Sequence, residues 1–181
     1  MAEFQLETER LVLRDWRGEE DVDDFHRLGS DERVMATLGP LMTRQGSAAL
    51  VADLQARSLD FGHTFWALER KSDSRVIGFC GLVRGHIAPI AGELEIGWRL
   101  AHDCWGKGYA SEAAQAAIGW AFANRPGEAV IAITSQNNMR SRALMERLGM
   151  HHISSRDFEH PSLMPGDPLR AHVLYRKDPP Q

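Results

Sequence analysis

Hydrophobic and polar positions repeat along the chain with two different periods, and these periods separate the predicted strands from the predicted helices. In residues 92–100, apolar side chains alternate with polar or small ones, as in a half-buried strand. Between residues 110 and 121, small apolar residues recur every three or four positions. This second pattern predicts an amphipathic helix whose small side chains let it lie close to a sheet.

The same periods place the other elements in an alternating order. Further strands are predicted at residues 10–16, 63–70, 75–84, 129–134 and 170–176, and further helices at residues 19–28, 47–59 and 137–149. Helices and strands are mixed along the whole chain, without repeats, low-complexity segments or linkers. This order predicts a single α/β (α+β) domain over residues 1–181, with a core of about 8–177, and a mixed, mostly antiparallel sheet.

Composition and charge narrow the class of protein. The 181 residues are 43% hydrophobic and 25% charged, which is ordinary for a globular domain, and the net charge of -4 argues against nucleic acid as a partner. No apolar run approaches the roughly 20 residues that span a bilayer, and the first residues lack a signal-peptide pattern. The two cysteines suggest no disulfide framework. We therefore expect a cytoplasmic protein, monomer or homodimer, without a membrane partner.

The stretch CWGKGYASEA, residues 104–113, places a glycine-rich turn directly before a helix. Gly106 and Gly108 permit the positive φ angles that a nest of backbone N–H groups requires. The helix adds unpaired N–H groups and a partial positive charge at its start, so the turn predicts a phosphate site. Neither common phosphate motif fits, because a P-loop would need glycine at Ala101 and the dinucleotide fingerprint would need glycine at Ser111.

Two long signatures follow one another in the sequence, EIGWRLAHDCWGKGYASEA at residues 95–113 and NNMRSRALMERLGM at residues 137–150. With the opening LETERLVLRDW and the closing HVLYR, they cover nearly the whole chain. The sequence resembles the GCN5-related N-acetyltransferase (GNAT) superfamily, and more narrowly the branch that contains the ribosomal-protein alanine acetyltransferases. This resemblance implies an enzyme that transfers an acetyl group from acetyl-CoA to an amine.

The acetyl-CoA loop of that superfamily has the form Q/R-x-x-G-x-G/A. Trp105, Gly108 and Ala110 occupy its three defined positions, so tryptophan replaces the first residue, as it commonly does in the resembling branch. Asn138 and Ser141 match the second signature of the branch. The departure at Trp105 matters little, because the phosphate contacts of the loop are mostly made by the backbone.

The resemblance also implies where the cosubstrate binds. The fourth and fifth strands of the sheet would splay apart, pantetheine would pair with freed backbone groups of the fourth strand, and the pyrophosphate would lie on the glycine-rich turn. The implied cofactor-binding residues are Trp98, Arg99, Leu100, Trp105, Gly106, Lys107, Gly108, Tyr109, Ala110, Ser111 and Asn138. For Lys107 an exposed loop lysine, and for Asn138 a helix cap, remain the alternative roles.

Acetyl transfer requires a neutral amine and a group that donates a proton or a hydrogen bond to the leaving thiolate. Glu95 is the first candidate base, acting through water, because its side chain projects from the strand beside the cofactor gap. Glu93 lies on the same face and is the alternate, as a base or as a substrate-binding residue. Ser141 is the candidate proton donor, with a tyrosine as the alternative. Trp66 is expected at the acceptor site, together with the loops 39–46 and 157–168. For the loop 157–168, a plain connecting role remains the alternative.

The acceptor class can be bounded by the free energy of deprotonation. At pH 7 a lysine amine costs roughly 4–5 kcal/mol to deprotonate, against about 1 kcal/mol for an α-amine, so α-amines or small-molecule amines of low pKa are favoured. The resemblance points the same way and implies a protein N-terminal α-amine. A small-molecule amine, such as an antibiotic or polyamine, is the alternative acceptor, and a non-catalytic acyl-CoA-binding module is the alternative class. The histidines lack metal-ligand spacing, so no metal is expected.

Overall fold

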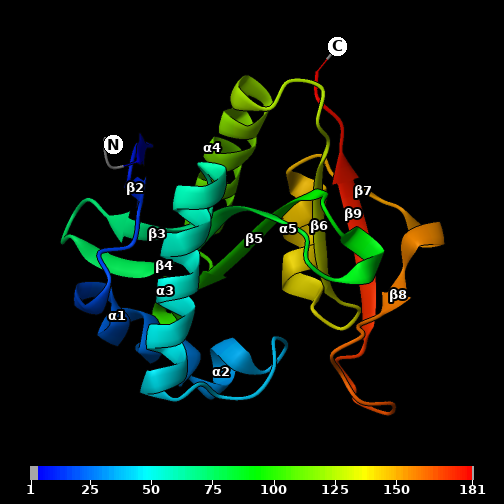
Figure 1. The fold of residues 1–181 in the computed structure, drawn as a ribbon, viewed down its shortest axis with the longest axis horizontal. Helices are drawn as coiled ribbons and strands as arrows, with labels where there is room; N and C mark the ends of the chain where they lie inside the picture. The colour runs from blue at the N-terminus through cyan, green and yellow to red at the C-terminus, as the bar shows by residue number, and fades with distance from the viewer. Residues whose placement is uncertain (1–3, 181) are drawn as a thin grey trace.

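The computed structural model describes residues 4–180, which form one mixed sheet with helices on both faces (Figure 1). The strands are β1 (Gln5–Glu7), β2 (Leu11–Arg14), β3 (Phe65–Arg70), β4 (Arg75–Arg84), β5 (Leu94–Leu100), β6 (Val130–Ser135), β7 (His151–His152), β8 (Phe158–Glu159) and β9 (Ala171–Lys177). The helices are α1 (Glu19–Gly29), α2 (Glu32–Met35), α3 (Arg44–Phe61), α4 (Tyr109–Asn124) and α5 (Met139–Arg147). The strand order is β1-β2-β3-β4-β5-β6-β9-β7, with β8 also beside β9.

The sheet is antiparallel except at one pair of neighbours, β5 and β6, which run parallel. A parallel pair needs a crossover connection, and here α4 supplies it. The predicted α/β domain with a mixed, mostly antiparallel sheet is therefore confirmed.

The β5–β6 pair holds together over only a short length. Leu94 pairs with Val130 and Glu95 with Ile131, and no pairing continues beyond Glu95. The edge of β5 that faces β6 is therefore without a strand partner from Ile96 onward. These strands are the fourth and fifth of the sequence prediction, and they diverge as expected.

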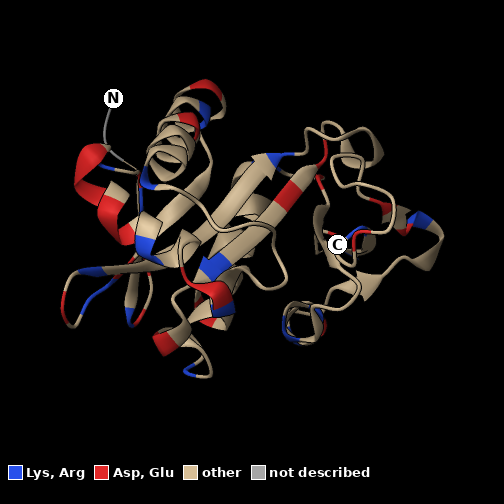
Figure 2. Cartoon of the chain, turned by 90° about the horizontal axis from the view of Figure 1, so that it is seen from below, with Lys and Arg blue, Asp and Glu red and all other residues tan. Residues whose placement is uncertain are grey.

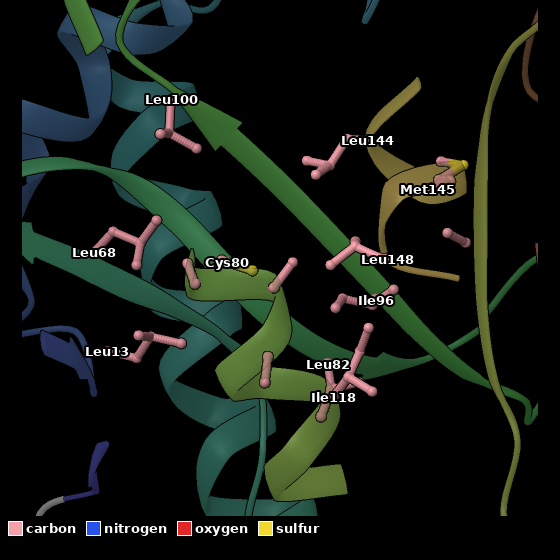
Figure 3. Close-up of a cluster of buried hydrophobic side chains, with 14 of the residues drawn as sticks. Leu13, Leu68, Cys80, Leu82, Ile96, Leu100, Ile118, Leu144, Met145 and Leu148 are labelled. Atoms are coloured by element: carbon pink, nitrogen blue, oxygen red, sulfur yellow. The ribbon is translucent and has the colours of Figure 1, made fainter. Parts of the chain in front are cut away.

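Hydrophobic side chains of α5 lie beside the divergent part of β5. Leu144 and Leu148 point from α5 toward Leu100 and Ile96 of β5, and they belong to the same buried cluster (Figure 3). The open stretch of β5 is therefore backed by an apolar surface, while its backbone groups lack strand partners.

Each face of the sheet has its own core. On one face, the alanines of α4 at positions 113, 114 and 117 are fully buried against β4 and β5, which confirms the predicted small-residue helix face. On the other face, α1 and α3 cover a second cluster that includes Phe25, Val51 and Phe79. Because side chains alternate along a strand, neighbouring residues of β5 contribute to different faces.

Several element boundaries differ from the sequence prediction for local reasons. The helix predicted from residue 47 begins at Arg44, because the Thr43 hydroxyl caps it by accepting a hydrogen bond from the Gly46 N–H at 3.1 Å. The last three residues of the predicted loop 39–46 are thus helical. The strands β1, β7 and β8 and the helix α2 were not predicted. They are two to four residues long, and elements this short are too short to show a hydrophobic period.

Charged residues occur throughout the described chain (Figure 2), and the first turn of α1 holds three acidic residues, Glu19, Glu20 and Asp21. Among residues 4–180, no helix combines the length and the apolar character needed to cross a membrane.

Candidate active site

The glycine-rich turn before α4 has the backbone geometry of an anion nest. Gly106 and Gly108 adopt φ angles of 72° and 81°, in the left-handed region. None of the backbone N–H groups from Gly106 to Ser111 donates a hydrogen bond to another described residue, and the first intrahelical bond begins at Glu112. A row of free donors at a helix N-terminus is the arrangement that binds phosphate groups.

Trp105 fixes this turn against the end of β5. Its indole Nε1–H donates to the Leu100 carbonyl at 2.9 Å, and the Arg140 guanidinium lies 4.5 Å from its ring centroid. The tryptophan at this position therefore has a defined structural role. It also uses the Leu100 carbonyl, so the free carbonyls that pantetheine could reach lie earlier in β5.

Glu95 has an electrostatic environment that suits a general base. Its side chain is half-buried, it accepts no hydrogen bond from any described residue, and its carboxylate is not sealed from solvent. Burial raises the pKa of Glu95 to about 7, although Arg57 of α3 acts in the opposite direction. A carboxylate that titrates near neutral pH can both accept and release a proton during turnover.

Glu93 lies just before β5 and has the opposite environment. Both of its carboxylate oxygens accept hydrogen bonds from Arg156, at 2.9 and 2.5 Å. These bonds lower the pKa of Glu93, against the effect of partial burial. Glu93 is thus a weaker base than Glu95, and its side chain ties the region after β7 to the start of β5.

Asn138 and Ser141 lie together at the start of α5. The Asn138 side chain accepts a hydrogen bond from the Ser141 N–H at 3.3 Å and donates to the Thr134 hydroxyl at 3.0 Å. Asn138 therefore caps the helix and ties it to β6, whichever contacts it also makes with a cosubstrate. The Ser141 hydroxyl makes no hydrogen bond to a described residue, so it is available to donate a proton.

The two tyrosines are both occupied within the fold. Tyr175 is fully buried, and its hydroxyl donates to Glu146 and accepts from Arg142. Tyr109 is covered by the Arg10 guanidinium, which lies 4.6 Å from its ring centroid. The Tyr175 hydroxyl therefore lacks the freedom of Ser141, and the Tyr109 side chain also interacts with Arg70.

Two predicted residues require correction or refinement. Trp66 is wrong as an acceptor-site residue, because it is 0% exposed and stacks on Phe4 on the α4 face of the sheet. Strand alternation puts it on the face opposite to Glu95. Arg99 contributes only its backbone to the open edge of β5, since its guanidinium lies over Phe79 on the α1 and α3 face.

A small cavity of about 150 Å³ lies at the carboxyl end of β6. It is lined by Thr37, Leu38, Ile133, Thr134, Ser135, His160, Leu163, Leu169 and His172. Burial lowers the pKa values of His160 and His172, whose rings lie 4.8 Å apart. The predicted loop 157–168 thus meets the segment before α3 here. A larger cavity, about 450 Å³, lies between Ile118 and Lys177, away from the glycine-rich turn.

One part of the site was missed by the sequence analysis. Thr8 and Arg10, in the turn between β1 and β2, bind the Glu112 carboxylate of α4. The only signal for this contact was the stretch ETER in the opening motif. Nothing in that stretch shows which distant residue it contacts.

The residues present fit an acetyl-CoA molecule. Free N–H groups from Gly106 to Ser111 suit its pyrophosphate, and the unpaired edge of β5 suits an extended chain with amide groups. Within the described part of the chain, no group of three His, Cys, Asp or Glu side chains could hold a metal ion.

Comparisons with known proteins agree with this geometry. The family model described as acetyltransferase (GNAT) domain matches residues 10–151. The chain is 30% identical over 145 residues to the uncharacterized N-acetyltransferase p20 of Bacillus licheniformis, covering 79% of this chain and 80% of that protein. An acetyltransferase structure from Agrobacterium tumefaciens C58 superposes with a TM-score of 0.76 at 27% identity, covering 98% of this chain and 95% of that one.

A further solved structure shows a likeness of fold alone. RimL, a ribosomal L7/L12 α-N-protein acetyltransferase, superposes with a TM-score of 0.76 at 17% identity and covers 98% of this chain and 96% of its own. The family model covers most of the sequence, and it includes the open strand edge and the glycine-rich turn. This chain is an N-acetyltransferase that belongs to the GNAT family.

Proposed function

We propose that this enzyme acetylates a protein N-terminal α-amine, using acetyl-CoA in a ternary complex, with Glu95 as the general base. The observation that carries the proposal is the state of Glu95. It is a half-buried carboxylate without a hydrogen-bond partner among residues 4–180, and burial raises its pKa to about 7. The pKa of an α-amine, about 8, lies within roughly one unit of this value, whereas a lysine amine lies more than three units above it.

Bound acetyl-CoA supplies an activated acetyl thioester. The free N–H groups from Gly106 to Ser111 hold its pyrophosphate, and the backbone of β5 from Ile96 to Arg99 pairs with its pantetheine arm. Glu95, through one water molecule, takes the proton that the amine loses when its nitrogen bonds to the carbonyl carbon. Ser141 donates a proton to the sulfur as the carbon–sulfur bond breaks, so the hydroxyl is then reprotonated by solvent.

The cavity at the end of β6 supports an acceptor with a small terminal residue. Its volume of about 150 Å³ exceeds that of one small side chain but not that of a large antibiotic. Its histidines have lowered pKa values, so they do not repel an ammonium group at neutral pH. The fold shared with RimL, which acts on a protein α-amine, points in the same direction.

Release of CoA thiol from acetyl-CoA tests the proposal directly. The acceptors are peptides with free N-terminal Ala, Ser or Met, the same peptides with a blocked N-terminus and an internal lysine, polyamines, and aminoglycosides. We expect turnover with the free N-termini and none with the blocked peptides. Turnover confined to polyamines or aminoglycosides would show a small-molecule acetyltransferase instead, and binding of acetyl-CoA without any turnover would show an acyl-CoA-binding module.

A further inference from the structure

The acidic residue in the first turn of α4 poses an electrostatic problem for the glycine-rich turn. Glu112 is four residues beyond Gly108, and its carboxylate is 17% exposed. A bare negative charge beside the free N–H groups would repel the pyrophosphate that they are proposed to bind. The structure shows how this charge is compensated.

Both oxygens of the Glu112 carboxylate are held by the turn between β1 and β2. One oxygen accepts from the Thr8 hydroxyl at 2.6 Å and from the Arg10 backbone N–H at 2.8 Å. The other accepts from the Arg10 guanidinium, with Nε and Nη2 each at 2.7 Å. Although partial burial acts against them, these bonds lower the pKa of Glu112.

The same guanidinium reaches the glycine-rich turn itself. Its Nη1 donates to the Lys107 carbonyl at 2.9 Å, and its plane covers the Tyr109 ring. A Cβ atom at Gly108 would lie only 3.3 Å from Nη2. Arg10 therefore occupies the Lys107 carbonyl with a hydrogen bond, and it adds a positive charge beside the N–H groups of the turn.

We propose that Arg10 and Glu112 are positioning residues of the acetyl-CoA site: Arg10 neutralises Glu112 and holds the Lys107 carbonyl, so that the turn presents only N–H donors to the pyrophosphate. This inference rests on the proposed placement of acetyl-CoA. Thr8 completes the arrangement by fixing the carboxylate that Arg10 binds. The opening stretch ETER is thereby part of the cosubstrate site, although it lies about a hundred residues before the turn.

Four variants distinguish an electrostatic effect on acetyl-CoA binding from a purely structural one. They are Arg10→Ala, Glu112→Gln, the double variant with both changes, and Arg10→Lys. Titration calorimetry gives the affinity for acetyl-CoA, and steady-state rates with S-acetylpantetheine, which lacks the pyrophosphate, give a matched control. We expect Arg10→Ala to weaken acetyl-CoA binding about 10- to 100-fold, because an unmatched carboxylate then faces the phosphates. Its rate with S-acetylpantetheine should stay within about twofold of the wild type.

The double variant carries the decisive comparison. Removing the Glu112 charge should restore most of the affinity that Arg10→Ala loses, and Arg10→Lys should lose less than Arg10→Ala. Equal losses in the single and double variants, or a parallel loss with S-acetylpantetheine, would show a merely structural role and overturn the inference. If the wild type binds acetyl-CoA and Arg10→Ala binds it equally well, the inference about Arg10 is wrong and the proposed function is unaffected. Wild-type protein that fails to bind acetyl-CoA would overturn the proposed function.

Discussion

Replacing Glu95 by glutamine removes a carboxylate whose pKa is about 7 in the folded protein, against an ordinary value of 4.5. In the wild type, the folded state holds this proton more tightly than the unfolded state does. The contribution to stability is therefore fully present below pH 4.5 and is lost as the pH rises toward 7. At about 1.4 kcal/mol per pKa unit, the shift from 4.5 to about 7 corresponds to at most about 3.5 kcal/mol, and partial contact with solvent reduces it to about 1–3 kcal/mol.

Urea unfolding at pH 4 and pH 8 measures this effect. We expect Glu95→Gln to have nearly wild-type stability at pH 4 and to exceed the wild type by about 1–3 kcal/mol at pH 8. Glu93→Gln, two residues away, is the matched control. Its carboxylate is stabilised by Arg156 and has a lowered pKa, so that variant should lose stability at pH 8 and change least at low pH. Equal shifts for both variants would refute the assigned environment of Glu95.

The same variant tests catalysis. The wild-type kcat/KM should rise with pH through an inflection near 7, and Glu95→Gln should lose that inflection together with about 100-fold in rate at pH 7. At high pH, where more of the amine is already neutral, the difference should shrink. A profile of unchanged shape in Glu95→Gln would refute the role as base, and a lost inflection in Glu93→Gln would transfer that role to Glu93.

Four further changes test other parts of the site. Gly108→Glu should abolish acetyl-CoA binding measured by calorimetry, because Gly108 has a φ of 81° and lies beside the proposed phosphate site. The control Gln115→Glu adds the same charge on an exposed part of α4 and should bind acetyl-CoA normally. Lys107→Ala should weaken binding less than about tenfold, because backbone donors carry most of the site, and a hundredfold loss would contradict this. Ser141→Ala should lower kcat about 100-fold or more at every pH with the acetyl-CoA affinity nearly unchanged, and a loss of affinity instead would make the serine structural. Arg99→Met should raise the free energy of unfolding by about 1 kcal/mol in urea, because the buried Nε has no acceptor in the described part of the chain. A destabilised variant would show that the contacts of the guanidinium with aromatic rings contribute more.

The fold could be predicted from the sequence where short-range patterns were strong. Alternation in β5, the alanine stripe of α4 and the glycines at 106 and 108 all act within a few residues, so they are visible in the sequence itself. Burial of small side chains and the φ angles open to glycine follow from local sterics. The resemblance accordingly predicted the divergence of β5 from β6, and the turn chemistry predicted the nest before α4.

Other features depend on which distant segments meet, and the sequence by itself did not determine them. The pKa of Glu95 follows from desolvation by packed neighbours, and the occupied state of Glu93 follows from a salt bridge to Arg156, 63 residues away. Trp66 was misplaced because a tryptophan in a strand can face either side, and only the packing of Phe4 shows which. The contact of Arg10 with Glu112 spans 102 residues. Such long-range contacts carry no local period, so only the tertiary structure showed that the turn between β1 and β2 contacts the first turn of α4.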